Sequence, residues 1–253
     1  MISIENVSFG YSKKSEILSG VNAKIERGTV TALVGPNGSG KTTLLRITSG
    51  ILAQKSGKIF IDGEDASLIS RIERAKKIAY LPQTRSIPDV TVSRLVLSGR
   101  FPHTTFFHRY KNDDFQKAKE SIKKLGIEDL SEKNLLELSG GQRQKSYIAM
   151  ALSQCAPALL LDEPLTFLDT RQQLELLSLV KNLAAEGKAV LMVIHDLSLA
   201  LSYADRLIVL SNGKIISDSS PHEAIQNGAI EEAFGVKIEK AFTKSGEKWF
   251  FSL

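Results

Sequence analysis

The strongest pattern in this sequence of 253 residues is Val30-Thr31-Ala32-Leu33-Val34-Gly35-Pro36-Asn37-Gly38-Ser39-Gly40-Lys41-Thr42. Its first five residues have the character of a buried strand, and the rest fit G-x-x-x-x-G-K-[ST]. A helix-compatible stretch follows over residues 42–49. In such a strand–loop–helix unit the glycines let backbone N–H groups turn toward phosphate oxygens, and the helix N-terminus adds a favourable dipole. The segment therefore predicts a phosphate-binding loop (P-loop) in an α/β domain.

Two side chains at the end of this loop supply the chemistry that a nucleotide requires. Lys41 provides a positive charge for the β- and γ-phosphates, and the hydroxyl of Thr42 is a ligand for Mg²⁺. The predicted cofactors are therefore ATP and Mg²⁺. The residues expected to contact the nucleotide in this segment are Gly35, Pro36, Asn37, Gly38, Ser39, Gly40, Lys41, Thr42 and Thr43.

A second pattern is an apolar strand, Ala158–Leu161, that ends in two acidic residues, Asp162 and Glu163. The carboxyl ends of the strands are where α/β sheets place ligand sites. Asp162 can hold the metal through water, and Glu163 can accept a proton from an attacking water. Two solvated acids at a strand end would be unremarkable alone, but beside a phosphate-binding loop they predict a metal ligand and a general base.

A third pattern is Ser139-Gly140-Gly141-Gln142 at the start of an expected helix. A glycine pair before a helix N-terminus is another arrangement that binds anions. An ordinary helix cap would explain these residues equally well if they stood alone. A second phosphate-binding helix start has no partner within the same domain, however, so we expect it to face the nucleotide of another copy of the chain.

Apolar runs of strand length recur at Val30–Val34, Ile78–Leu81, Ala158–Leu161, Ala189–Ile194 and Leu207–Leu210. Several are apolar throughout, as in parallel strands that are covered on both faces. Between the last runs, Thr170–Glu186 has leucines at helical spacing, with Asp169 as its N-cap and Gly187 as its stop. Strands that alternate with helices indicate a parallel α/β sheet.

The remaining segments differ from this α/β pattern. Short antiparallel strands are expected at Ile2–Val7, Val21–Ile25 and Lys58–Ile61, and hairpin turns at Asn212-Gly213 and Ser245-Gly246. No strand pattern occurs between about residues 91 and 156. An amphipathic helix is expected at Asn112–Lys124, with Phe115, Ala118, Ile122 and Leu125 on one face, and a second helix between Gly141 and Pro157.

Composition limits the classes of function. The chain has 33 basic and 28 acidic residues, a net charge of +5 that is spread along its length. Nucleic-acid-binding proteins cluster such charge on one face, so we expect no nucleic-acid partner. The single cysteine, Cys155, excludes an intramolecular disulfide and is expected to be a small buried apolar residue. No transmembrane span or signal peptide is recognisable, so attachment to a membrane would require another chain.

The motifs, in this order, resemble the nucleotide-binding subunit of an ABC transporter, and the resemblance covers nearly the whole chain. Further matches to the family's pattern are Tyr11 as the adenine-stacking aromatic, Gln83 in the Q-loop, Ser139, Gly140, Gly141 and Gln142 as the signature motif, Asp169 in the D-loop, and His195 as the switch histidine. The resemblance implies catalytic roles for Glu163, His195 and Gln83, and a metal site formed by Thr42, Gln83 and Asp162.

The resemblance also implies an architecture and partners. We expect one domain over residues 1–253, with a RecA-like α/β core, an antiparallel β subdomain and an inserted α-helical subdomain over about residues 88–156. Two copies would sandwich two ATP molecules. Transmembrane permease subunits would hold this homodimer peripherally at the cytoplasmic face of the cell membrane, and an extracytoplasmic solute-binding protein would act indirectly.

Finer features are similar to importer subunits for iron–siderophore complexes, haem and cobalamin. They are Thr91-Val92 with Ser98–His103, the run Phe167–Gln173, and Phe234-Gly235-Val236. Leu165 and Met150 depart from residues that many relatives carry, threonine and arginine, and neither position carries phosphate chemistry. Two alternatives remain open, a soluble ABC ATPase of iron–sulfur assembly and the ATPase subunit of an exporter. The Gln142-Arg143-Gln144 continuation favours the transporter over the former.

Overall fold

The computed structural model describes residues 1–12, 15–104, 109–243 and 246–252. Its strands are β1 (Ile2–Phe9), β2 (Leu18–Ile25), β3 (Val30–Val34), β4 (Ser56–Ile61), β5 (Glu64–Asp65), β6 (Ile78–Leu81), β7 (Ala158–Leu161), β8 (Ala189–Val193), β9 (Arg206–Ser211), β10 (Lys214–Ser219), β11 (Lys237–Thr243) and β12 (Gly246–Ser252). Its α-helices are α1 (Lys41–Ser49), α2 (Arg71–Lys77), α3 (Val92–Ser98), α4 (Asn112–Lys124), α5 (Gly140–Ser153), α6 (Thr170–Ala185), α7 (Leu197–Tyr203), α8 (Pro221–Gln226) and α9 (Ala229–Phe234). Short 3₁₀ turns lie at Phe101–His103, Glu128–Leu130 and Leu135–Glu137.

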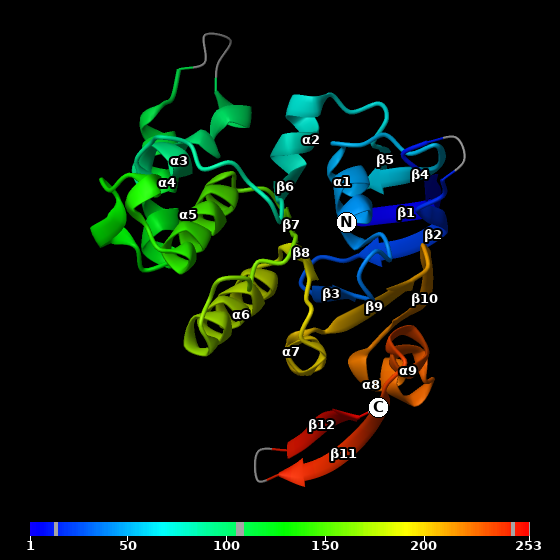
Figure 1. The fold of residues 1–253 in the computed structure, drawn as a ribbon. Coiled ribbons are helices and arrows are strands. Elements are labelled where there is room, and N and C mark those ends of the chain that lie inside the picture. The colour runs from blue at the N-terminus through cyan, green and yellow to red at the C-terminus, as the bar shows by residue number, and fades with distance from the viewer. Residues whose placement is uncertain (13–14, 105–108, 244–245, 253) are drawn as a thin grey trace.

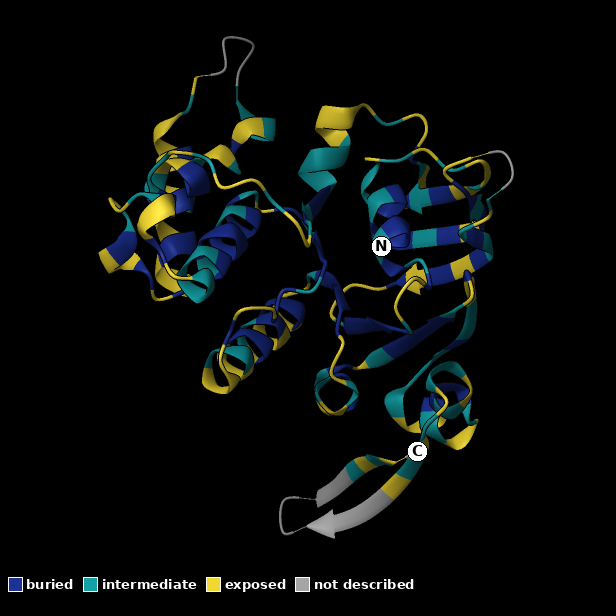
Figure 2. Ribbon diagram, in the orientation of Figure 1, coloured by how far each residue is buried: buried dark blue, intermediate teal, exposed yellow. Residues whose placement is uncertain are grey.

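A six-stranded sheet in the order β10-β9-β3-β8-β7-β6 forms the centre of the molecule (Figure 1). Its pairs are parallel, except that β9 and β10 form an antiparallel hairpin. Every residue of β3, β7 and β8 is buried, as Figure 2 shows by their dark blue colour. Strands covered on both faces require such continuously apolar sequences. The predicted parallel α/β sheet is therefore confirmed.

A second, antiparallel sheet in the order β2-β1-β4-β5 contains the N-terminal strands. Strand β1 alternates between buried residues such as Ile2 and Ile4 and more exposed ones such as Ser3, because this sheet buries only one face. The three expected strands are present as β1, β2 and β4, and each is longer than predicted. The backbone N–H of Ser19 donates to the carbonyl of Gly213 at 2.9 Å, which joins this sheet to the β9–β10 hairpin.

The described residues between β6 and β7 form helices, with no strand longer than an isolated bridge. Helices α3, α4 and α5 pack on one another to the side of the central sheet (Figure 1). Helix α6 and helix α7 lie closer to the sheet and pack against β3. None of the helices that the structure describes is both long and apolar enough to cross a bilayer.

The C-terminal segment folds back as the predicted hairpin. Strand β11 pairs antiparallel with β12, with Lys237 opposite Ser252 at one end and Thr243 opposite Gly246 at the other. Ser245 of the expected turn lies outside the described residues. Ile238, Trp249 and Phe251 pack against the main core. The hairpin thus joins the same hydrophobic core as α8 and α9.

Two expectations about single residues were wrong. Phe115 in α4 is 53% exposed and makes an edge contact with Tyr110 instead of packing in the core. Cys155 is exposed, because it lies just after the end of α5 with φ of 56°. A helix commonly ends on a residue in this left-handed conformation, and the chain there turns outward.

The sequence Ser98–His103, which resembles importer subunits, has a structural role here. Arg100 is 5% exposed, and its Nε donates to Oδ1 of Asp114 at 3.0 Å, while its Nη1 donates to the carbonyl of Ser153 at 2.9 Å. His103 Nε2 contacts the carbonyl of Gln154 at 2.8 Å. Arg100 therefore fixes the C-terminus of α5 to the first turn of α4.

We predict that Arg100→Met lowers the free energy of unfolding by about 3 kcal/mol at pH 7, because the Asp114 carboxylate stays buried without its cation. Burial alone would raise the pKa of Asp114, but the Lys111 N–H and the Arg100 guanidinium hold it below its ordinary value. This carboxylate therefore stabilises the fold above its unfolded-state pKa of about 3.9, and that contribution is lost as pH falls through the lower folded pKa.

Urea unfolding at several pH values measures this effect. The difference in the free energy of unfolding between wild type and Arg100→Met should narrow as pH falls from about 4 through the lower folded-state pKa of Asp114. Arg27→Met is the matched control, because Arg27 also pairs with an aspartate, Asp62 at 3.1 Å, but on the surface. It should cost at most about 1 kcal/mol. Equal losses for the two variants would contradict a structural role for the buried pair.

Candidate nucleotide-binding and catalytic site

The predicted phosphate-binding loop runs from the carboxyl end of β3 into α1. Gly38 has open space around it, but its φ of +80° is a backbone conformation that favours glycine. At Gly35 the reason is steric, because a Cβ there would lie 2.0 Å from the carbonyl oxygen of Leu210. Helix α1 begins after Gly40, and none of the described side chains caps it. Its first N–H groups are therefore available to an anion.

The loop borders a cavity of about 570 Å³. The cavity is lined by Tyr11, Ile17, Asn37, Gly38, Gly40, Lys41, Thr42, Thr43, Gln83, Glu163 and His195. Beside it, Oγ of Ser39 is buried and has no hydrogen-bond partner among the described residues. A buried polar atom without a partner is rare in native structures, and this hydroxyl could bond to an oxygen of a ligand in the cavity. The fold thus brings residues from five separate parts of the chain together around one cavity.

Lys41 is the buried cation of this site, with 7% of its surface exposed. Its Nζ donates to the carbonyls of Gly35 and Pro36, both at 2.8 Å, so the loop wraps around its own lysine. Burial lowers the pKa of Lys41, while the nearby charges of Glu163 and Asp162 act in the opposite direction. The ammonium group therefore lies where it can reach phosphate oxygens.

Asp162 is completely buried at the end of β7. Its Oδ1 accepts a hydrogen bond from Oγ1 of Thr42 at 3.1 Å, and its Oδ2 accepts one from the hydroxyl of Tyr80 at 3.3 Å. Burial raises the pKa of Asp162, helped by the charge of Glu163 and opposed by these two hydrogen bonds. Burial and the charge of Asp162 also raise the pKa of Tyr80 to about 12.

Sequence reasoning missed Tyr80 as a member of this site. It lies on β6, next to β7 in the sheet, with Leu81 in register opposite Leu161. Its partner is therefore set by strand pairing, which the pattern of a single strand does not reveal. The ends of β6 and β7 and the start of α1 are joined through one carboxylate.

The hydroxyl of Thr42 and the carboxylate of Asp162 fit a magnesium ion. Both supply oxygen atoms, which lie 3.1 Å apart, and Thr42 lines the cavity. Among the described residues, no cluster of three or more His, Cys, Asp or Glu side chains forms a complete metal cage. Magnesium commonly takes only one or two protein ligands and completes its shell with substrate phosphates and water.

Glu163 and His195 are in direct contact, with 2.6 Å between Oε1 and Nε2. Glu163 follows the buried strand β7 and is largely buried, whereas the side chain of His195 is 48% exposed and follows β8. The backbone of Glu163 has φ of 53°, a left-handed conformation that is strained for a glutamate. Such strain occurs where the surrounding structure holds a residue in a functional position.

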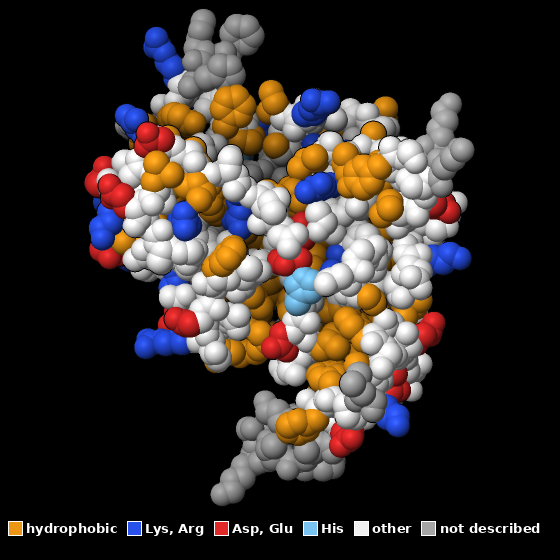
Figure 3. Space-filling view, viewed as in Figure 1, with side chains coloured by type: hydrophobic (Ala, Val, Ile, Leu, Met, Phe, Trp, Pro, Cys, Tyr) orange, Lys and Arg blue, Asp and Glu red, His pale blue; other side chains and the backbone are white. Residues whose placement is uncertain are grey.

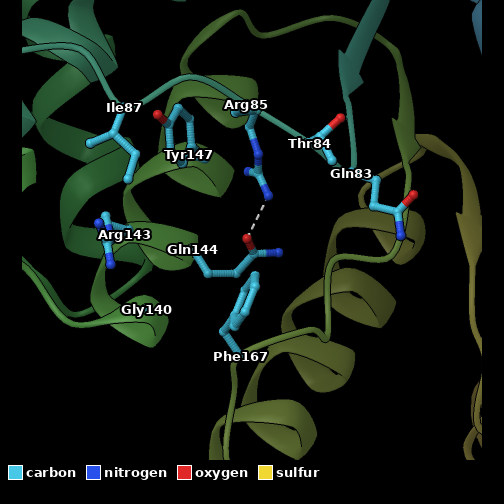
Figure 4. Close-up of a pocket in the computed structure, with 9 residues that line it drawn as sticks. All are labelled: Gln83, Thr84, Arg85, Ile87, Gly140, Arg143, Gln144, Tyr147 and Phe167. Atoms are coloured by element: carbon cyan, nitrogen blue, oxygen red, sulfur yellow. Dashed lines mark hydrogen bonds between the residues drawn. The ribbon is translucent and has the colours of Figure 1, made fainter.

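Tyr11 and Gln83 both line the cavity. Tyr11 is 60% exposed, and its hydroxyl is 3.3 Å from Oγ1 of Thr43, so its ring is available for stacking beside the loop. Gln83 is exposed and lines this cavity as well as a neighbouring cavity of about 330 Å³, shown in Figure 4. Both residues line the cavity that the phosphate-binding loop borders.

The predicted signature residues do not line the nucleotide cavity of their own chain. Oγ of Ser139 accepts from the N–H of Gln142 at 3.3 Å, and Oε1 of Gln142 accepts from the N–H of Ser139 at 3.0 Å. This reciprocal cap leaves the hydroxyl proton of Ser139 free to donate to an anion. Asp169 likewise caps α6 through the N–H of Gln172 at 2.8 Å.

The glycine pair has a second role that the sequence pattern did not reveal. A Cβ on Gly140 would lie 3.3 Å from Cβ of Phe167, and one on Gly141 would lie 3.0 Å from Oε1 of Gln172. The start of α5 therefore packs closely on the segment before α6. The two self-capped helix starts form one surface outside the nucleotide cavity.

This sheet and phosphate-binding loop define a P-loop nucleotide hydrolase. The sequence matches the family described as ABC transporter over residues 18–166. The chain belongs to the ABC transporter family of ATP-binding proteins and is an ATPase of that family.

Curated relatives resemble the chain over its whole length. The petrobactin import ATP-binding protein FpuC of Bacillus anthracis is 38% identical, covering 100% of this chain and 92% of the relative. The ferric enterobactin transport ATP-binding protein FepC of Escherichia coli is 38% identical, covering 92% of this chain and 86% of the relative.

Solved structures of ABC transporters and of their ATP-binding cassettes have the same fold as this chain. An ABC transporter assigned to the metal-chelate type, in an inward-facing conformation, has a TM-score of 0.84 at 27% identity and covers 99% of this chain and 96% of its own. A dimeric structure of a bacterial ABC transporter cassette has a TM-score of 0.78 at 28% identity, covering 87% of this chain and 99% of its own. The expected family and fold class are therefore confirmed.

We predict that Lys41→Ala weakens ATP binding tenfold to a hundredfold, because a charge-assisted hydrogen bond to phosphate contributes about 1.5–3 kcal/mol. Nucleotide titration of the purified chain measures this. Lys188→Ala is the matched control, since Lys188 also donates to a backbone carbonyl, that of Ala156 at 2.8 Å, and burial also lowers its pKa. An unchanged affinity in Lys41→Ala would refute the assignment of the cavity.

Proposed function

We propose that this chain is the ATP-hydrolysing subunit of an ABC importer that powers uptake of an iron–siderophore complex, haem or cobalamin. Support comes from the names of the relatives, which describe petrobactin, ferric enterobactin, iron(3+)-hydroxamate and cobalamin import or transport. The observation that carries the ATPase role is the cavity that brings Lys41, Thr42, Glu163 and His195 together at the carboxyl edge of the sheet.

The proposed chemistry assigns one task to each group. The P-loop amides and Lys41 bind the phosphates, and Tyr11 stacks on the adenine. Thr42 and Asp162, with Gln83 at the rim, hold Mg²⁺, which when bound neutralises charge on the phosphate oxygens. Glu163 accepts the proton of the attacking water, and His195 contacts the γ-phosphate and orients Glu163 from 2.6 Å away.

The signature surface completes the site from a second copy of the chain. Ser139, Gly140, Gly141, Gln142 and Asp169 lie outside the cavity of their own chain, yet Ser139 has a hydroxyl proton to donate. Two copies facing each other would place each signature helix against the other copy's nucleotide. ATP then favours the closed dimer and hydrolysis releases it, because only the closed form makes these contacts.

A surface on and beside α2 suits the permease subunits. Leu68, Ile72 and Phe101 are all more than half exposed, and α2 packs against the 3₁₀ turn Phe101–His103. Figure 3 shows apolar and basic side chains together over this part of the molecule. Exposed apolar groups that gather in this way mark interaction sites. Docking here would hold the subunit peripherally at the cytoplasmic face of the membrane, with a solute-binding protein delivering substrate from the other side.

Glu163→Gln tests the proposed function. The variant keeps the shape of the side chain but loses the proton acceptor, so turnover should fall by at least a hundredfold, within the 10²–10⁴-fold range of about 3–5 kcal/mol that general bases contribute. ATP binding should persist, and the ATP-bound dimer should accumulate. Steady-state ATPase assays and size-exclusion chromatography with ATP measure the two effects.

Glu186→Gln provides the control for Glu163→Gln. Glu186 is an exposed carboxylate that pairs with Lys124 at 3.7 Å, outside the cavity, and its variant should retain the parental rate. A Glu163→Gln variant that hydrolyses ATP at the parental rate would remove Glu163 from the role of general base.

A further inference from the structure

A buried amide connects the helical region to the turn that carries Glu163. Gln144 in α5 is 2% exposed, and its Nε2 donates to the carbonyl of Pro164 at 2.6 Å. Its Oε1 accepts from Nη2 of Arg85 at 2.6 Å (Figure 4). Because each end of the amide is occupied by a partner of opposite polarity, its orientation is fixed. Gln144 thus joins three segments that are far apart in the sequence.

The carbonyl that Gln144 holds belongs to the residue directly after Glu163. The backbone of Glu163 is strained, with φ of 53°. A conformation of this kind costs about 1–3 kcal/mol and persists only where neighbouring contacts hold it. The turn also receives a bond from the Thr166 N–H to the Glu163 carbonyl at 3.4 Å and one from Gln173 to the Leu165 carbonyl at 3.3 Å. The bond from Gln144 is much shorter than either.

The other partner of Gln144 belongs to the segment that follows Gln83. The guanidinium carbon of Arg85 lies 4.5 Å from the ring centroid of Tyr147, one turn further along α5. The hydroxyl of Tyr147 donates to the carbonyl of Ser86 at 2.6 Å. Helix α5 therefore contacts this segment at two residues, Arg85 and Ser86. Arg85 is in turn connected through Gln144 to the turn after β7.

A cavity lies beside the hydrogen bond between Arg85 and Gln144. The cavity of about 330 Å³ lies between the segment 83–87, the start of α5 and Phe167. In Figure 4, Arg85 extends across it to Gln144, while Gln83 lies at its far side. Nη1 of Arg85 is buried and has no hydrogen-bond partner among the described residues. With space on one side of the segment, the contacts of Arg85 and Tyr147 are what hold it against α5.

We propose that Gln144 and Arg85 are positioning residues for ATP hydrolysis. They hold the turn after β7 so that the carboxylate of Glu163 is oriented toward the attacking water. Neither side chain lines the nucleotide cavity, so they act through the Pro164 carbonyl and not on the nucleotide itself. A shift of α5 or of the segment after Gln83 would move the base through this path. The inference rests on the proposed role of Glu163.

Gln144→Met and Arg85→Met test the proposal, because methionine matches the length of glutamine and resembles the aliphatic part of arginine but removes the hydrogen bonds. We expect kcat for ATP hydrolysis by the full-length chain to fall about tenfold or more in each, since small misplacements of catalytic groups have effects of up to about a hundredfold. The KM for ATP should change less than twofold. If Gln144→Met does not fold, Arg85→Met alone carries the test.

Gln154→Met is the matched control. Gln154 follows the last turn of the same helix, and its Nε2 also joins α5 to the core, by donating to the carbonyls of Ala75 and Ile78 (2.9 Å to the latter). These contacts are remote from Glu163, so this variant should lower the thermal unfolding midpoint and keep kcat within twofold. A purely structural role for Gln144 predicts equal loss of kcat in Gln144→Met and Gln154→Met.

The outcomes separate the two proposals. A selective loss of kcat in Gln144→Met and Arg85→Met supports the positioning role. Parental kcat in both, a loss confined to KM, or an equal loss in Gln154→Met overturns it. If Glu163→Gln abolishes turnover while Gln144→Met does not, the positioning role alone fails. If Glu163→Gln retains turnover, the proposed base itself is refuted, and the positioning role with it.

Discussion

Lys41 donates to the carbonyls of Gly35 and Pro36 while it faces the carboxylates of Asp162 and Glu163. Burying one cation beside two acids brings their charges close together in a medium of low dielectric constant, where each strongly affects the others. The phosphate loop, the end of β7 and the start of α1 must therefore keep their relative positions. Strand β3 supplies this rigidity, since it lies in the middle of the sheet between β8 and β9.

The same sheet separates the two kinds of contact that the site needs. The groups that we propose to hold phosphate and to accept a proton lie at the carboxyl ends of β3, β7 and β8, all within one chain. The signature residues begin α5, which packs with α3 and α4 beside the sheet. Gln144 bridges the two regions, so the orientation of the helical region and the geometry of the base are physically connected. In the proposed function, this connection would couple the dimer interface and the permease surface to ATP hydrolysis.

Much of the core and site was predictable because the strand-forming runs are apolar throughout and the loop has a distinctive spacing. The short helices α2, α3 and α7 were not predicted, since seven residues are too few to show a clear helical periodicity. The sequence indicated Asp162 but not its partner Tyr80, because that contact depends on the register of β6 against β7. For the same reason, Gln144 gave no signal that it holds the Pro164 carbonyl.

The proposal that each ATP site is shared between two chains is tested most directly by three ATPase rates: those of Ser139→Arg, of Lys41→Ala, and of the two variants covalently linked as one pair. In the linked pair, one site combines an intact Lys41 with an intact Ser139, and the other site is doubly damaged. We expect little activity for either variant alone and partial recovery in the linked pair. A parental ATPase rate for Ser139→Arg alone would contradict the shared site, because the large arginine side chain at position 139 would then not lie against the phosphate of the other chain's ATP.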